Sequence, residues 1–177
     1  VMLNRLVPVL VLALVTPAVA AELSDRYEAI GTMTVTLGDE TLELVIPYDR
    51  EKDSAYAEQK MIMGSFLTVN SVGRSVGEDG EPGRPMVQVT LQKQGGAMAL
   101  ISAELFDEQG FDAPMAMGAD GGAGSLVEYS FENDRLEARV EGEFLRLTGY
   151  MSEPQPAEGA EPVATTISWS VDVPPME

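Results

Sequence analysis

The chain has 177 residues, no cysteine and no histidine, and its formal net charge is −18. The missing histidine removes the commonest general base and metal ligand, and the missing cysteine removes thiolate chemistry, disulfides and most zinc sites. The excess of acidic residues argues against nucleic acid and anionic lipid as partners and favours a soluble domain.

The first twenty residues have the three-part layout of a secretory signal peptide. Arg5 precedes an apolar run from Leu6 to Val15, and Ala18-Val19-Ala20 places small residues before a cleavage point at Ala21. A spanning helix needs about 20 apolar residues, so this run is short, although retention as an anchor stays open. We expect residues 1–20 to be removed and residues 21–177 to form a single β-rich domain, periplasmic or secreted, without a stable membrane span.

Apolar and polar residues alternate with a period of two along much of the domain, which is typical of strands. Residues 32–46 predict a hairpin around Gly38-Asp39 that sets Val35 opposite Leu42 and Met33 opposite Leu44. Residues 87–105 predict a second hairpin, in which an odd-numbered loop at Gly95-Gly96 sets Leu91 opposite Ile101 and Val89 opposite Ala103.

Residues 127–147 predict a three-stranded meander with turns at Asn133-Asp134 and Gly142-Glu143. Its expected cross-strand pairs are Phe131 with Leu136, Val127 with Val140, Val140 with Leu145, and Glu128 with Arg139. A last strand, residues 165–173, ends at Pro174-Pro175, and its alternation points the only tryptophan, Trp169, into the core.

The remaining segments have less regular patterns. Asp53 fits the cap of a short helix, and residues 61–69 fit a strand that is buried on both faces. Residues 73–85, 107–124 and 152–162 predict loops, and the Pro-rich stretch 152–164 is expected to be mobile. Together the strands predict an all-β fold, an antiparallel β-sandwich with a small β-barrel as the alternative.

Two methionine pairs are candidate soft-metal ligands. Met61 with Met63, and Met115 with Met117, have the i, i+2 spacing that puts both thioethers on one face of a strand, and thioethers select Cu(I). Methionine also fills gaps in apolar cores. We expect core packing for the first pair, in an apolar strand, whereas the second pair follows Pro114 in a glycine-rich loop and is harder to bury.

Acidic residues crowd one predicted loop and are candidate calcium ligands, but they lack the ordered spacing of an EF-hand. They are Asp107, Glu108, Asp112 and Asp120. The motifs of serine hydrolases, zinc proteases and phosphate-binding loops are missing from the sequence. We therefore assign no catalytic, cofactor-binding or metal residue and expect no cofactor.

The sequence thus predicts an exported, acidic, non-catalytic β-domain that serves as a binding or accessory module of the cell envelope. The alternatives are a methionine-based Cu(I)-binding periplasmic protein and a weak calcium-binding, lipid-binding or glycan-binding protein. The partner and the oligomeric state stay open. An empty apolar interior would favour lipid binding, whereas a filled interior would direct the search to loops and sheet edges.

Overall fold

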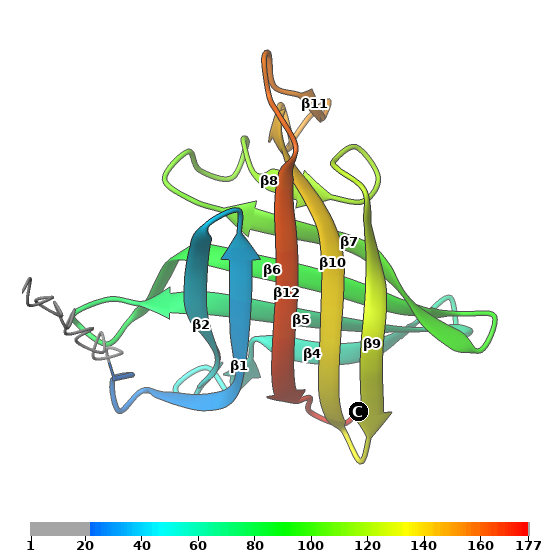
Figure 1. The fold of residues 1–177 in the computed structure, drawn as a ribbon. Coiled ribbons are helices and arrows are strands. Elements are labelled where there is room, and N and C mark those ends of the chain that lie inside the picture. Colours follow the sequence, from blue (N-terminus) through cyan, green and yellow to red (C-terminus); the bar gives the residue numbers. More distant parts are fainter. Residues whose placement is uncertain (1–21, 177) are drawn as a thin grey trace, which may run out of the picture.

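The structure is a computed structural model that describes residues 22–176, so the expected signal peptide and its cleavage point at Ala21 lie outside the described residues. Every regular element in the described part of the chain is a strand (Figure 1). The strands are β1 (Tyr27–Leu37), β2 (Glu40–Asp49), β3 (Ser54–Ala55), β4 (Ala57–Ile62), β5 (Phe66–Val76), β6 (Pro82–Gln94), β7 (Ala97–Phe106), β8 (Met115–Met117), β9 (Gly124–Glu132), β10 (Arg135–Thr148), β11 (Gln155–Pro156) and β12 (Val163–Asp172).

Eight of these strands close into an antiparallel barrel. They follow one another in the order β2-β1-β12-β10-β8-β7-β6-β5, and β5 returns to β2 through the bridge between Arg74 and Val45. The other strands, β3, β4, β9 and β11, are attached to this ring. The expected sandwich is therefore wrong and the barrel alternative is confirmed, because hydrogen-bonded neighbours run all the way round the ring instead of leaving two separate sheets.

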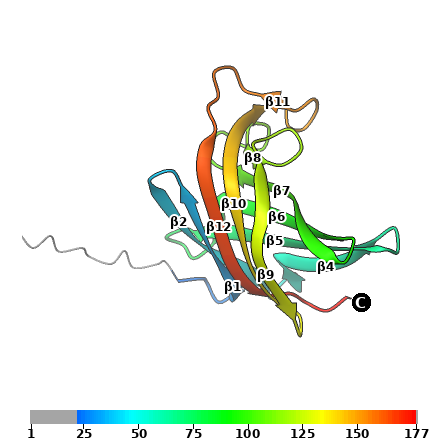
Figure 2. The ribbon, with the colours of Figure 1, turned by 45° about the vertical axis from the view of Figure 1, so that its right-hand side comes forward.

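The barrel is flattened into two layers whose strands cross (Figures 1 and 2). We call β2, β1, β12, β10 and β9 the β10 layer, and β4, β5, β6 and β7 the β6 layer. The β4–β5 and β6–β7 hairpins extend beyond β9 on the same side of the molecule in both views.

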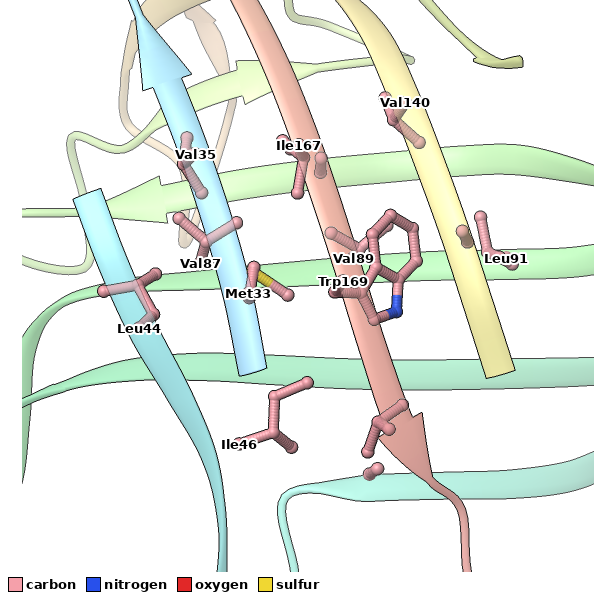
Figure 3. Close-up of a cluster of buried hydrophobic side chains, with 14 of the residues drawn as sticks. Met33, Val35, Leu44, Ile46, Val87, Val89, Leu91, Val140, Ile167 and Trp169 are labelled. Carbon is pink, nitrogen blue, oxygen red and sulfur yellow. The ribbon is translucent and has the colours of Figure 1, made fainter. Parts of the chain in front are cut away.

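Side chains from both layers fill the space between them. Trp169 of β12 is 4% exposed, and its Nε1 donates a hydrogen bond to the Ser71 hydroxyl of β5 at 3.2 Å. Figure 3 shows Trp169 beside Val89 and Leu91 of β6, with Met33 and Ile46 nearby. The predicted inward direction of Trp169 is confirmed, and the filled interior directs attention to the outside of the barrel.

The first hairpin has the predicted register. Val35 lies opposite Leu42, Met33 opposite Leu44 and Thr34 opposite Glu43, around a turn that begins with Gly38 at a φ of 58°. Val35 has no exposed surface, whereas the Thr34 hydroxyl on the other side donates to the Glu43 carboxylate at 2.9 Å. The alternation of the sequence therefore assigns the two sides of this hairpin correctly.

The second hairpin contains an extra residue, as predicted, but this residue lies within a strand and not in the loop. Gln94 pairs with Ala97, so the loop is the two-residue turn Gly95-Gly96, with φ values of 58° and 93°. The extra residue is a bulge further along, where Leu91 pairs with Leu100 and Thr90 pairs with Ser102. The predicted Val89–Ala103 pair is confirmed, and the Leu91–Ile101 pair is wrong because the odd residue is Ile101 in the strand.

The third unit is a hairpin followed by one long strand. Phe131 pairs with Leu136 and Glu128 with Arg139, as predicted, but a bulge sets Leu126 and not Val127 opposite Val140. Gly142-Glu143 makes no turn, because β10 continues through it to Thr148 and pairs with β9 first and β8 later. The predicted Val140–Leu145 pair is wrong for the same reason.

Residues 53–69 also differ from expectation. Asp53 begins no helix, and the stretch that resembles a doubly buried strand is two strands, β4 and β5, joined by a turn at Met63-Gly64. The predicted loops are shorter than expected, because residues 73–76 and 82–85 lie in β5 and β6, 115–117 form β8, and 155–156 form β11. Short apolar runs do not distinguish one strand from a tight hairpin, and this explains the first error.

Candidate functional site

The burial of the two methionine pairs is the reverse of what the sequence predicts. Met115 and Met117 are 8% and 0% exposed and belong to the core cluster. Met61 and Met63, expected in a core strand, are 45% and 89% exposed at the β4–β5 turn. The loop pair became buried because residues 115–117 add a strand between β7 and β10. The fold places the two pairs on different elements.

The acidic loop holds its carboxylates with separate partners. Asp107 forms a two-pronged ion pair with Arg146 of β10, with N–O distances of 3.1 and 2.5 Å. Burial raises the pKa of Asp107, but the hydrogen bonds from Arg146 and from the Gln109 backbone N–H, together with the Arg146 charge, outweigh it, and the net direction is downward. Asp112 instead accepts the backbone N–H of Met151. In residues 22–176 no three carboxylates gather as a metal site would require, so Glu108 and Asp120 join no such cluster.

A buried carboxylate that the sequence analysis missed lies on β7. Glu104 is 6% exposed, and its Oε2 has no hydrogen-bond partner within the described chain. Burial raises the pKa of Glu104, while hydrogen bonds from Ser102 and Tyr150 oppose that rise. Burial and the neighbouring Glu104 raise the pKa of the Tyr150 phenol to about 12. The pair is covered by an aromatic group in which Phe106 contacts Phe111 and Tyr150.

The outer side of the β10 layer carries charged and hydroxyl side chains on β1, β12, β10 and β9. We call this surface the charged face. It includes a groove of about 570 Å³ that is open to solvent. The polar side chains that line this groove are Thr32, Glu128, Ser130, Glu137, Arg139, Ser168 and Ser170. Its only guanidinium, Arg139, is paired with Glu141, so the groove has carboxylates in excess.

The outer side of the β6 layer is different, and we call it the acid-free face. Its side chains point away from the core because their neighbours Val69, Val87, Val89 and Leu91 point inward and are buried. The residues of the face are Lys60, Thr68, Asn70, Gln88, Thr90 and Gln92. These six side chains carry one charge, the Lys60 ammonium, and otherwise only amides and hydroxyls, while the exposed Glu58 adjoins them at the β4 edge and the buried Glu104 of β7 pairs with Gln88.

Hydrogen bonds between strands hold the acid-free face in place. Thr90 donates to the Asn70 amide oxygen at 2.8 Å, and Gln92 donates to the Thr68 hydroxyl at 3.2 Å. At the rim, Glu58 accepts bonds from Lys60 and Asn70, and these bonds lower the pKa of the Glu58 carboxyl. Ordered side chains lose less conformational entropy when a partner binds, so this face is preorganised for contact.

The distribution of acids along the chain produces this difference. None of the 29 acidic residues lies within residues 59–77 or 82–103, and these two stretches contain Lys60, Arg74, Arg84 and Lys93. The topology makes the two stretches neighbours, since β5 pairs with β6 and β4 with β5. These stretches thus form a part of a strongly acidic protein without carboxylates, flanked by Glu58 and Glu104 and by the turn that carries Glu78, Asp79 and Glu81. The charge pattern was visible in the sequence, but only the strand pairing shows that it forms one surface.

Comparisons with models of protein families, with curated proteins and with solved structures find no match to this chain. Residues 22–176 contain no helix of the length and apolarity needed to cross a bilayer.

Proposed function

We propose that the protein is an exported, non-catalytic binding module of the cell envelope, and that it docks through the acid-free face. The observation that carries this proposal is the segregation of acids, which leaves residues 59–77 and 82–103 without a carboxylate in a chain of net charge −18. Two surfaces of like charge repel each other when they approach, whereas a neutral or basic patch allows close contact. The face therefore suits a partner surface that is anionic or uncharged and polar.

The amide and hydroxyl groups of the face support the same conclusion. Gln88 and Gln92 are half-buried and lie on β6, in the middle of the β6 layer. An interface excludes most charged side chains from its centre, and the charges it does contain lie mainly at its rim. The acid-free face has this arrangement, with Lys60 and Glu58 at the β4 edge.

The test adds the same charge to the two faces in turn. Gln88→Glu/Gln92→Glu places two carboxylates on the acid-free face, and Thr36→Glu/Ser168→Glu places two on the charged face at exposed positions. Retention of the purified protein on native envelopes is measured for both. We expect the first variant to lose about tenfold in apparent affinity, roughly 1.4 kcal/mol, and the second to bind like the wild type.

Equal retention of the two variants would exclude the acid-free face as the docking surface. A greater loss in the Thr36→Glu/Ser168→Glu protein would assign docking to the charged face. Melting temperatures measured in parallel ensure that only folded variants are compared.

A further inference from the structure

The tip of the β4–β5 hairpin exposes apolar side chains on both of its sides. Met61 pairs with Leu67 on one side, and Ile62 pairs with Phe66 on the other. Met61, Met63 and Phe66 are 45%, 89% and 42% exposed. A tip that is apolar all round differs from the rest of the β6 layer, where one side faces the core and the other is mainly polar, apart from the half-buried Val72 and Met86.

The residue at the turn itself has no conformational reason to be methionine. Met63 has a φ of 51° and is followed by Gly64 at 68°, a left-handed pair that favours Asn, Asp or Gly. Two other turns of the chain with the same handedness use the favoured residues, Asn133-Asp134 and Gly95-Gly96. At position 63 the chain thus keeps a large apolar side chain that is both conformationally strained and exposed to water.

The tip itself carries no acid, and the acid that precedes it on β4, Glu58, is paired with Lys60 at 3.0 Å. The hairpin from residue 59 to residue 77 has no acid and includes Lys60, and the adjacent β6–β7 hairpin contributes Lys93. Lys93 is one residue beyond Gln92, which pairs with Thr68 of β5. Both hairpins project past β9 on the same side (Figures 1 and 2). A lysine ammonium beside an apolar tip suits the phosphate level of a bilayer, because its aliphatic stem accompanies the apolar groups.

We propose that the β4–β5 hairpin tip, residues 61–66, inserts into the surface of a lipid bilayer, with Met63 and Phe66 below the phosphates and Lys93 at the level of the headgroups. The proposal rests on the proposed function in one respect, since it identifies the partner of the acid-free face as the membrane surface. A bilayer surrounds an inserted tip, which accounts for apolar side chains on both sides of the hairpin. A groove on a protein would require only one apolar side.

The test uses the absence of cysteine from the chain. Met63→Cys and, as a matched control, Met151→Cys, where Met151 is 74% exposed on another loop, are each labelled with an environment-sensitive fluorophore. The full chain is mixed with vesicles of phosphatidylcholine alone or of phosphatidylcholine with phosphatidylglycerol. We expect a blue shift and an intensity rise at position 63 and none at position 151 on phosphatidylcholine, with no larger change on the anionic vesicles, because the net charge of −18 opposes anionic lipid.

A flotation assay provides the second measurement. Met63→Gln/Phe66→Gln is compared with Met151→Gln/Phe111→Gln, which removes one exposed methionine and one exposed phenylalanine elsewhere. The N-terminal segment is common to all variants. We expect about tenfold less vesicle binding for the hairpin variant than for the control variant.

The proposal is overturned if the label at position 63 stays in water while the protein floats with vesicles, or if the two double variants float equally. It is also overturned if the protein binds neither kind of vesicle. These results remain distinct from a failure of the proposed function, because envelope retention that is sensitive to Gln88→Glu/Gln92→Glu would still identify a docking face for a partner other than lipid.

Discussion

The outer faces of the two layers differ although both layers contribute to the same core. On the β10 layer the outward positions hold threonine, serine, arginine and several exposed carboxylates, and on the β6 layer they hold mainly amides and hydroxyls, with the Lys60–Glu58 pair at the β4 edge. The inward positions of both are apolar and buried. Folding requires apolar side chains at the inward positions but not at the outward ones. We therefore infer that the difference between the two outer faces reflects what each face contacts.

Inward and outward positions of a strand should differ sharply in how much an added carboxylate destabilises the domain. Val35→Asp should destabilise the domain by several kcal/mol because it buries a carboxylate without a partner, whereas Thr34→Asp should cost about 1 kcal/mol, since it only loses the bond to Glu43 and sets two solvated carboxylates opposite each other. Thr34→Asp also adds charge to the charged face beside Glu43. Thermal or urea unfolding of the two variants measures the difference. Equal shifts in melting temperature would contradict the assignment of the two sides.

The second prediction compares two ion pairs of β10. Arg146 is 18% exposed and makes two bonds to Asp107 and one to the Ala113 carbonyl, whereas Arg139 on the charged face is 44% exposed and pairs with Glu141. Arg146→Gln should cost about 1.5–3 kcal/mol and Arg139→Gln about 0.5 kcal/mol or less. Urea unfolding at low and at high salt checks both values. A loss at Arg139 as large as that at Arg146 would mean that the charged face is structural.

The third prediction concerns Glu104, the buried acid of β7 that pairs with Gln88 of the acid-free face. Its folded-state pKa is raised above the ordinary value of 4.5, so the folded state binds the proton more tightly than the unfolded state does. This contribution to stability is complete below pH 4.5 and is lost as the pH rises through the folded-state pKa. Glu104→Gln should therefore be more stable than the wild type at neutral pH, by about 1 kcal/mol.

The measurement for Glu104 is the difference in unfolding free energy between wild type and Glu104→Gln from pH 4 to pH 8. The difference should grow with pH in favour of the variant, because glutamine has no proton to lose. A difference that is constant across this range would show that Glu104 does not titrate with a raised pKa. Glu108→Gln, an exposed neighbour, is the control and should show no such trend.

Much of the fold is predictable from alternation, and its failures share a physical cause. The hairpin around Gly38 and the inward direction of Trp169 follow from period two, because each has one buried side. Bulges at Ile101 and Val127 change the parity inside a strand, where no glycine or proline marks them. Gly142 resembles a turn but lies inside β10, since tertiary pairing on both edges holds the strand extended there.

The candidate sites were less predictable than the fold. Acidic residues that are close in sequence, such as Asp107 and Asp112, take different partners in space. Conversely, the acid-free face combines two stretches whose relation depends on β5 pairing with β6. The exposure of Met63 was hidden because a hairpin with apolar residues on both sides has the same local pattern as a buried strand.

The number of paired residues between neighbouring strands varies around the barrel. Between most neighbours the ladder extends over many residue pairs, but β2 and β5 meet through the single pair Val45 and Arg74. Local opening follows the weakest cooperative boundary, so amide protons next to this seam should exchange with solvent earliest among those of the barrel strands. The domain would then open as two leaves, the β10 layer and the β6 layer, that stay joined through the short strand β8 between β10 and β7. Pulling on β2 would open the barrel while the leaves themselves stay intact.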